Sequence, residues 1–415
     1  MHPKHVDPNA CEIRGVETRA EVEQVADLYG KAFRGYEWHY RNYTDLLLKR
    51  LPREQWRLSR VMWTPDGVPV ASLRIADRTV RIGSVMVRMG GIGDVCTHPF
   101  CRKLGLMRRL FSHSVDYMRA EPYDLSYLGG IPNFYDKFGF ITVHGHWSLQ
   151  LPRAQVARLK GVYAGRTARR ADADAIERLF QADLAIRDGA MLRPGRRWLT
   201  RWLKDRRLRL LVDAKGRARA YYSASPDGDA FVLHEVSLGS TPDRDGIVSV
   251  IADMVKVAKS HEKPNLHFSL PPEHPLGQFC LADGCTQRRS IGHRGGGMAR
   301  ITNLETLCAH MAPEWARLLA ASPAAGWCGR LRIKTNIGTL DLAIAPGSVV
   351  AQPAKGRAAA EIAADQDKLC RLVVGFHSPA TAALLGDVRI TKAALPLATA
   401  LFPRRAFAIF PPDRF

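Results

Sequence analysis

The chain has 415 residues, of which 46 % are hydrophobic and 24 % charged, and its formal net charge is +21. This composition is typical of globular proteins, and the length predicts about two to four domains. The sequence has no apolar run of about 18 residues and no secretory signal pattern at its start, which excludes a membrane-spanning segment. The eight cysteines show no dense disulfide framework, so we expect a cytoplasmic protein with free thiols and no membrane partner.

The first region begins with an amphipathic helix. Thr18 and Glu21 have the spacing of a capping box, and Val22, Val25 and Leu28 follow as its buried stripe. A second helix is expected at about 37–50. Strands follow, two of them joined by the turn "PDGVP", because Pro-Asp-Gly between apolar runs favours a hairpin.

A longer helix is expected at about 105–119, since apolar residues recur there at helical spacing. The short strand "YDLSYLG", the segment "NFYDKFGF" and the strand "ITVHGHWSLQL" follow it. The same order of elements begins again near residue 160 with "ADADAIERLFQADLA", so the sequence predicts an internal duplication with a period of roughly 150 residues.

The densest basic segment, at 193–211, lies in this second copy. It predicts a helix with an apolar face formed by Trp198, Leu199, Trp202 and Leu203, and with cations elsewhere at Arg196, Arg197, Arg201 and Lys204. Such a helix can bind nucleic acid or a membrane surface, or it can pack its apolar face into the core. We favour the core, because no recognised binding motif accompanies the cations.

From about residue 300 the pattern changes to the strand-rich segment "LRIKTNIGTLDLAIAPGSVV" and three short helical stretches. We expect a third, α+β domain at 300–415. It ends on "AIFPPDRF", where Pro411 and Pro412 stiffen the approach to Phe415. A terminal aromatic residue suggests docking, because loose termini are usually polar.

The segment "DVCTHPFCRKLGLMRRLF" at 94–111 has the pattern of an anion site. A strand ends at Thr97, a short basic loop contains Gly105, and a helix begins. Backbone N–H groups and the dipole at a helix N-terminus favour negative charge, and Lys103, Arg108 and Arg109 add cations. A pyrophosphate would suit this loop.

The strand, the motif V-x-x-x-P-x-x-R-x-x-G, the helix and "FYDKFGF" together resemble the GNAT superfamily of acetyl-CoA-dependent N-acetyltransferases. The three-part chain with a terminal Phe resembles the bacterial enhanced intracellular survival (Eis) branch. That resemblance implies an α+β fold of two tandem GNAT modules, with mixed central sheets flanked by helices, and a sterol-carrier-like C-terminal domain. The expected ranges are 1–155 for the catalytic module, 156–299 for the second module and 300–415 for the last domain.

The resemblance also implies roles for particular residues. Tyr135 would be the general acid for the departing CoA thiolate, and the carboxylate of Phe415 would be the general base for the acceptor amine. The expected acetyl-CoA-binding residues are Val95, Cys96 and Thr97 on the strand edge, Arg102, Lys103, Leu104, Gly105, Leu106, Met107 and Arg108 in the loop and helix, and Asn133 before the acid.

The second copy lacks these features. Its strand-to-helix corner reads "SLGSTPDRDGIVSV", and Asp243 and Asp245 would repel a pyrophosphate. No tyrosine falls in "LGQFCLADGC". We therefore predict that the second module is a degenerate, structural copy or shapes the acceptor pocket.

Other interpretations of single residues stay open. Tyr135 could be a core aromatic residue, the Phe415 carboxylate could be solvated, and Asp413 is a rival base. Cys96 could be a nucleophile, although we prefer a small strand residue because no histidine partner is placed by sequence. The C-x4-C pairs Cys96/Cys101 and Cys280/Cys285 lack a nearby H-x3-H, so we expect no metal.

The main hypothesis is an acetyl-CoA-dependent N-acetyltransferase that acts on a small-molecule amine or a lysine side chain. The alternative is a basic module on a relict scaffold that binds nucleic acid or an acidic surface, and nucleic acid is the less favoured partner. A strong positive charge argues against a simple polycation as acceptor, unless acidic residues such as Glu37 or Asp45 line the pocket mouth. The resemblance further implies a homo-oligomer, a hexamer in that branch.

Overall fold

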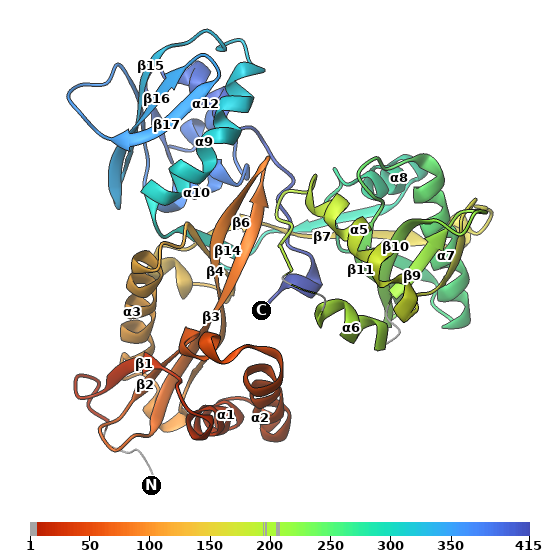
Figure 1. Ribbon diagram of the computed structural model, residues 1–415, viewed down its shortest axis with the longest axis horizontal. Helices are drawn as coiled ribbons and strands as arrows, with labels where there is room; N and C mark the ends of the chain where they lie inside the picture. The colour runs from red at the N-terminus through yellow and green to blue at the C-terminus, as the bar shows by residue number, and fades with distance from the viewer. Residues whose placement is uncertain (1–5, 194, 196, 205–207) are drawn as a thin grey trace.

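The computed structural model describes residues 6–193, 195, 197–204 and 208–415. These residues form an α+β protein with three mixed sheets, as the sequence predicted (Figure 1). In Figure 1 the first sheet lies below the third, the second stands apart from both, and the end of the chain lies between the first and second sheets.

The first sheet carries the candidate site. Its strand order is β1 (Glu12–Gly15), β2 (Ser59–Trp63), β3 (Pro69–Ile82), β4 (Val85–Thr97), β5 (Leu125–Gly130), β14 (Gly296–Ile301) and β6 (Ile141–His144). β4 and β5 run parallel, and the other neighbours are antiparallel. The helices of this region are α1 (Arg19–Ala32), α2 (Tyr36–Asp45) and α3 (Leu106–Ala120), and the shorter turns are η1 (Leu46–Arg50), η2 (Arg53–Leu58), η3 (Pro99–Cys101) and η4 (Tyr135–Phe138).

The helices begin where the residue pattern places them. Thr18 caps α1 in the predicted capping box: its Oγ1 accepts from the Glu21 N–H at 3.2 Å, and Glu21 accepts from the Thr18 N–H at 3.1 Å. The predicted stripe of Val22, Val25 and Leu28 is buried. The apolar face of α3 packs on the sheet through Leu110 and its neighbours at helical spacing.

The second sheet has seven strands arranged in the same way as those of the first. Its order is β8 (Ala164–Thr167), β9 (Leu208–Val212), β10 (Ala218–Asp227), β11 (Ala230–Ser237), β12 (Asn265–Phe268), β7 (His146–Pro152) and β13 (Thr286–Ser290). The helices of this region are α4 (Arg153–Val156), α5 (Ala173–Leu184), α6 (Arg197–Lys204), α7 (Arg244–Ser260) and α8 (Pro275–Asp283), with the turn η5 (Arg170–Asp172). β11 and β12 run parallel as β4 and β5 do, so the second module is a structural copy of the first.

The two copies exchange one strand each. β14 follows the second module in sequence but lies between β5 and β6 in the first sheet, and β7 follows the first module but lies between β12 and β13 in the second. Sheet membership therefore does not follow the contiguous divisions predicted at 155/156 and 299/300. The reason is that pairing across the modules completes both sheets.

The third sheet has the order β17 (Ser348–Pro353), β16 (Gly338–Ala345), β15 (Gly329–Thr335), β18 (Ala360–Ala363) and β19 (Arg389–Ile390). The predicted short helices are α10 (Gln366–Val373), α11 (Pro379–Leu384) and α12 (Leu395–Leu401), and the turn η6 (Pro411–Asp413) comes near the end. The helix α9 (Leu304–Ala320), which was not predicted from the sequence, packs its apolar face between this sheet and β4.

The predicted basic helix is α6, and its apolar face is core. Leu199 is buried, and Trp198 and Trp202 pack against the same cluster, where Trp198 lies 5.1 Å from the Phe180 ring. Arg201 and Lys204 are exposed. Arg196 and the side chain of Arg197 lie outside the described part of the structure. This packing agrees with the interpretation that the apolar face belongs to the core.

Candidate active site

The predicted anion site at 94–111, called the cradle below, lies between β4 and α3. The left-handed φ angles of Lys103 (68°) and Gly105 (79°) turn the chain so that α3 begins at Leu106. No side chain of the described residues caps the first turn of α3, so its N–H groups are available to an anion. A Cβ atom at Gly105 would meet no described atom within 4 Å, so space does not require a glycine there. The positive φ angle does, because other residues rarely adopt it.

A cavity of about 840 Å³ opens at this cradle. It brings together every predicted acetyl-CoA-binding residue except Asn133: Val95, Cys96, Thr97, Arg102, Lys103, Leu104, Gly105, Leu106, Met107 and Arg108 all line it, as does Tyr135. Such a volume is large enough for a cofactor-sized ligand. Arg102 also fixes the loop, since its guanidinium donates to the Ala32 carbonyl at 2.9 Å.

Asn133 does not line this cavity. It has a left-handed φ of 58°, and its N–H donates to the Arg294 carbonyl at 3.2 Å. The structure therefore places Asn133 in the turn that leads to Tyr135.

β4 and β5 separate beside the cradle. Their parallel pairing runs from Met89–Leu125 to Ile92–Leu128 and goes no further in the described structure. Next comes a bulge at Asp94, whose φ is 51° and whose carboxylate accepts from the buried Arg74 guanidinium at 2.6 Å. The predicted splayed edge at Val95–Thr97 thus pairs with β3 on one side and opens toward the cavity on the other.

Tyr135 begins η4 and lines the cavity with only 8 % of its surface exposed. Its ring packs on Phe134 (4.8 Å between centroids) and Phe111 (5.5 Å). Burial raises the pKa of the Tyr135 hydroxyl. The phenol is therefore held in its protonated form, as a proton donor requires.

The thiol of Cys96 is poorly suited to nucleophilic catalysis. Cys96 is buried, and burial, followed by the Asp94 charge, raises the pKa of its thiol. All eight cysteines are free thiols. In residues 6–193, 195, 197–204 and 208–415, no group of three or more His, Cys, Asp or Glu side chains is arranged to hold a metal ion.

Phe415 docks on the opposite face of the same sheet. A Cβ atom at Gly91 would lie 2.2 Å from the Phe415 ring, and one at Gly93 would lie 3.0 Å from the Phe415 carboxyl carbon. The Tyr127 ring meets the Phe415 ring edge-on, with centroids 5.9 Å apart. Two glycines on β4 therefore make the shallow seat that the terminal residue occupies.

A second cavity, of about 430 Å³, lies on this face and is lined by Phe415, Tyr127, His144, His146 and Arg414 among others. The Tyr127 hydroxyl lies 2.5 Å from His144 Nε2, and burial lowers the pKa of His144. Burial also lowers the pKa of His146. Both imidazoles are therefore favoured in their neutral forms near neutral pH.

The two cavities lie on opposite faces of the sheet. Ile92 and Leu128 pack with α3 and Tyr135, whereas Tyr127 and Phe415 belong to the cluster on the other face. Gly93 and Val95 are two residues apart on β4, which spans about 7 Å of strand. Gly93, beside the Phe415 carboxyl group, and Val95, which lines the first cavity, are therefore close neighbours on one strand.

The rival base Asp413 and the two acidic residues considered for the pocket mouth lie elsewhere. Asp413 is buried and bonds to Arg193 at 2.7 Å, and burial raises the pKa of its carboxyl although Arg193 opposes the change. Glu37 and Asp45 pair on the surface with Arg41 (3.6 Å) and Lys49 (2.6 Å). None of the three lines either of the two cavities described.

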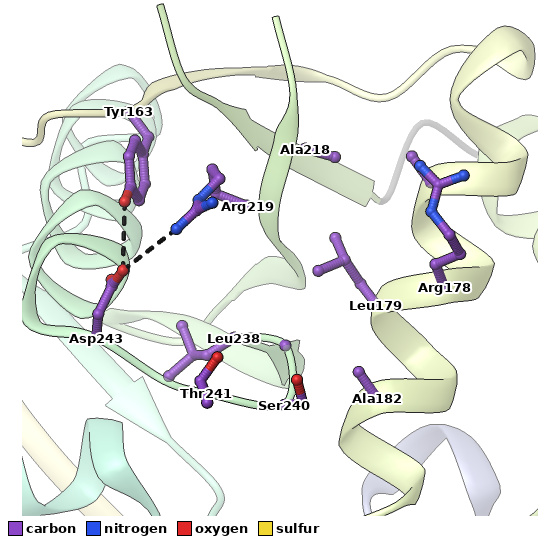
Figure 2. A pocket seen from close by; sticks show the side chains of 12 residues that line it. Tyr163, Arg178, Leu179, Ala182, Ala218, Arg219, Leu238, Ser240, Thr241 and Asp243 are labelled. Atoms are coloured by element: carbon purple, nitrogen blue, oxygen red, sulfur yellow. Dashed lines mark hydrogen bonds and ion pairs between the residues drawn. The ribbon is translucent and has the colours of Figure 1, made fainter. Parts of the chain in front are cut away.

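At the matching corner of the second module, Asp243 is bonded to Tyr163 and Arg219 beside a smaller pocket (Figure 2). Asp243 caps α7 by accepting from the Gly246 N–H at 2.6 Å, and its other oxygen lies 3.4 Å from the Tyr163 hydroxyl and 3.5 Å from the Arg219 guanidinium. The remaining cavity is about 220 Å³. The helix N-terminus that is open in α3 is thus closed by a carboxylate in α7.

Sequence reasoning missed Gly91, Gly93, Tyr127 and His144. The run "GGIGD" at the end of a predicted strand was the one available signal, because glycines in a strand mark a close approach of another group. The partner that approaches comes from more than 300 residues away in the chain, so the local pattern could not name it.

Comparison with known proteins agrees with this geometry. Residues 12–143 match the family described as acetyltransferase (GNAT) domain. No curated protein matches the chain. Within the described part of the chain, no helix combines the length and apolar character needed to cross a membrane.

Several solved structures share the fold over nearly the full length. A GCN5-related N-acetyltransferase from Anabaena variabilis has a TM-score of 0.75 at 16 % identity, over 97 % of this chain and 100 % of its own. One from Kribbella flavida has a TM-score of 0.73 at 18 % identity, over 98 % and 100 %. Eis1 from Mycobacterium abscessus has a TM-score of 0.66 at 14 % identity, over 98 % and 100 %.

Proposed function

We propose, on the premise that residues 12–143 belong to the GNAT acetyltransferase family within a chain of Eis-like fold, that this protein transfers an acetyl group from acetyl-CoA to a primary amine. The observation that carries the proposal is one cavity that holds an uncapped helix N-terminus, a splayed strand edge and a buried tyrosine.

The residues present fit acetyl-CoA. The N-terminal N–H groups of α3, with Lys103 and Arg108 nearby, suit a pyrophosphate. The free edge at Val95–Thr97 suits the amides of a pantetheine arm, because unpaired strand groups accept and donate backbone hydrogen bonds. A thioester is already activated, so positioning is the main task left to the protein.

The two proposed proton-transfer groups lie on opposite faces of the sheet, Tyr135 on one and the Phe415 carboxylate on the other. The carboxylate of Phe415 would accept a proton from the attacking amine, directly or through water, as the new N–C bond forms and the thioester C–S bond breaks. Tyr135 would give its phenolic proton to the departing sulfur. The N–H groups of the splayed strand would stabilise charge on the carbonyl oxygen.

The acceptor would enter the cavity beside Phe415. Among the described residues that line it, none is an Asp or Glu, while Arg414 adds positive charge. One carboxylate beside a cation favours an acceptor with a single amino group on a neutral body over a polycation. The cytoplasmic location and the hexamer stay predictions, and light scattering of the purified protein would test the second.

An amine panel tests the proposal. Purified protein is mixed with acetyl-CoA and single-amine, polyamine and lysine-peptide acceptors, while free CoA thiol and the mass of the product are measured. We expect thiol release that depends on the amine, with a product heavier by one acetyl group. Absence of release from the whole panel, together with absence of acetyl-CoA binding by calorimetry, would contradict the proposal and favour a binding module instead.

A further inference from the structure

A buried ionic cluster joins the last turn of the chain to the second module. Arg193 lies between two carboxylates: its Nε donates to Asp413 Oδ1 at 2.7 Å, and its Nη1 donates to Glu235 Oε1 at 3.1 Å. The side chains of Arg193, Glu235 and Asp413 are 9 %, 2 % and 6 % exposed. Glu235 belongs to β11 and Asp413 to η6, so one guanidinium connects two segments that lie far apart in the sequence.

Aromatic rings hold this guanidinium in place. Its central carbon lies 4.7 Å from the ring centroid of Phe180, 4.6 Å from that of Trp198 and 5.0 Å from that of Trp202. On the far side of the cluster, the Tyr221 hydroxyl donates to Glu235 at 2.7 Å. The planar fork of an arginine, stacked and bonded in this way, has a fixed direction as well as a charge.

The segment that precedes Phe415 is fastened again a few residues earlier. The Arg187 guanidinium lies 3.7 Å from the ring centroid of Phe410 and donates to the Ala408 carbonyl at 3.2 Å. Asp413 is the last of these attachments, two residues before Phe415, so the chain between them spans about 7 Å at most. The site at which Arg193 holds Asp413 thus limits where the terminal carboxylate can lie.

We propose that Arg193 is a positioning residue that, through Asp413, holds the carboxylate of Phe415 over Gly93 of β4. This inference rests on the proposed function, in which that carboxylate accepts the proton of the amine. It also gives the second module a role in the reaction, because its sheet and α6 hold the chain segment that ends at Phe415. The N-terminus of its own helix α7 is closed by Asp243.

Stability alone is a weaker explanation of the cluster. A buried ion pair stabilises a fold little more than well-packed apolar residues of similar volume, because both charges lose their hydration. What the pair adds is direction, and direction matters most next to a reacting group. A displacement of about 1 Å in a catalytic group can reduce turnover by about a hundredfold.

The test compares Arg193→Met with removal of Phe415, alone and together. We expect each single change to lower kcat for amine acetylation by about tenfold or more, with KM for acetyl-CoA unchanged. In the chain that lacks Phe415, Arg193→Met should cause little further loss, because both changes remove the same properly placed carboxylate.

The chain offers a matched control in the same sheet. Arg209 bonds to Asp253, to which Tyr222 also donates, just as Arg193 bonds to Glu235 beside Tyr221. Among the described residues, the side-chain bonds of Arg209 and Asp253 join β8, β9, β10 and α7, and none of them reaches the segment before Phe415. Arg209→Met should therefore leave kcat near that of the unchanged chain, with melting curves recorded for every variant.

The outcomes separate the inference from the proposed function. If removal of Phe415 lowers kcat and Arg193→Met does not, the positioning role is wrong and the function stands. If Arg193→Met and Arg209→Met lower kcat equally, the cluster is only structural. If removal of Phe415 has no effect, both the base assignment and the positioning role are wrong.

A second variant keeps the test informative if Arg193→Met does not fold. Asp413→Asn leaves Arg193 paired with Glu235 and weakens only the attachment to the terminal segment. It should lower kcat without raising KM for acetyl-CoA, and Asp253→Asn is its control. A kcat for Asp413→Asn equal to that of Asp253→Asn would contradict the proposal.

Discussion

Tyr135 is the residue whose chemistry the surroundings define best. It lines the cavity of the cradle, its ring is wedged between Phe111 and Phe134, and burial raises the pKa of its hydroxyl. Because the pKa lies above the ordinary tyrosine value of about 10, the phenol is protonated throughout the neutral pH range.

We therefore expect Tyr135→Phe to lower kcat by about a hundredfold or more while the acetyl-CoA dissociation constant stays the same, because the change removes only the hydroxyl that we propose as the proton donor. In the unchanged protein, the alkaline loss of kcat that belongs to this group should begin above about pH 10. Steady-state kinetics over pH and calorimetry with acetyl-CoA measure both. A variant with full turnover would show that Tyr135 is a core aromatic residue and not the acid.

Gly91 tests the seat of Phe415 from the side of the sheet. A methyl group at Gly91 would overlap the Phe415 ring at 2.2 Å, and a ring at the end of a side chain can move away at little cost in stability. Gly91→Ala should therefore melt near the temperature of the unchanged protein but lower kcat by about tenfold or more, since the terminal residue is displaced.

Gly326→Ala is the control for this change, because a Cβ atom there would meet no described atom within 4 Å. Equal kcat values for Gly91→Ala, Gly326→Ala and the unchanged protein would mean that the docked position of Phe415 is not used in the reaction.

At the scale of elements, features formed by residues close in the sequence were predicted correctly, whereas contacts between distant segments were not. The capping box of α1, the apolar face of α3 and the cradle could be predicted because their residues are neighbours in the sequence. α9 was missed: Pro313 lies inside it, and a proline usually indicates a helix end. Its burial between two sheets compensates for that proline.

Glu314 on α9 connects its own helix to the turn between β3 and β4 and to the segment that follows α12. Its carboxylate accepts from the Ser84 N–H at 3.0 Å, from Arg317 at 2.8 Å and from Arg405 at 2.7 Å. Burial alone would raise the pKa of Glu314, but hydrogen bonds from Arg317, Ser84 and Arg405 lower it to about 2. A lowered pKa stabilises the fold above the unfolded value of about 4.5, and this stabilisation is lost as the pH falls toward 2.

Acid unfolding followed by circular dichroism tests this connection. The melting temperature should fall steeply between about pH 4.5 and 2, and Glu314→Gln should destabilise the protein at pH 7 by about 3 kcal/mol and flatten that pH dependence. Glu305→Gln, an exposed change on the same helix, should do neither. If the two variants have the same acid profile, Glu314 does not link α9 to these two segments.

At the scale of the whole molecule, the exchange of β7 and β14 ties the two modules together. The sequence indicated the duplication but not the exchange, because the alternation of apolar residues in a strand does not specify which sheet it joins. The same limit applies to Arg193 and Asp413, which are brought together only by the complete fold.

The exchange predicts how fragments behave. Residues 1–160 lack β14, which leaves β5 and β6 without the strand between them, and residues 161–415 lack β7 in the same way. We expect either fragment alone to aggregate, because unpaired strand edges invite association. Co-expressed, the two should copurify with the circular dichroism of the full chain. A soluble, fully folded fragment 1–160 would show that the exchanged strand is dispensable.

The net charge of +21 does not by itself indicate a nucleic-acid partner. The apolar face of the most basic described helix, α6, packs into the core. Several arginines are committed to internal ion pairs, among them Arg74, Arg187, Arg193 and Arg209. Cations at the open cradle would instead help to attract an anionic co-substrate.

In the proposed reaction, amine acetylation uses the carboxylate of Phe415, which lies beside the splayed strand. The most direct test of this claim is the kcat for the best acceptor of the panel, measured on the chain that ends at Phe415 and on the same chain extended by a few Gly and Ser residues. We predict that the extension lowers kcat about a hundredfold and leaves acetyl-CoA binding unchanged. Equal turnover of the two chains would contradict the claim.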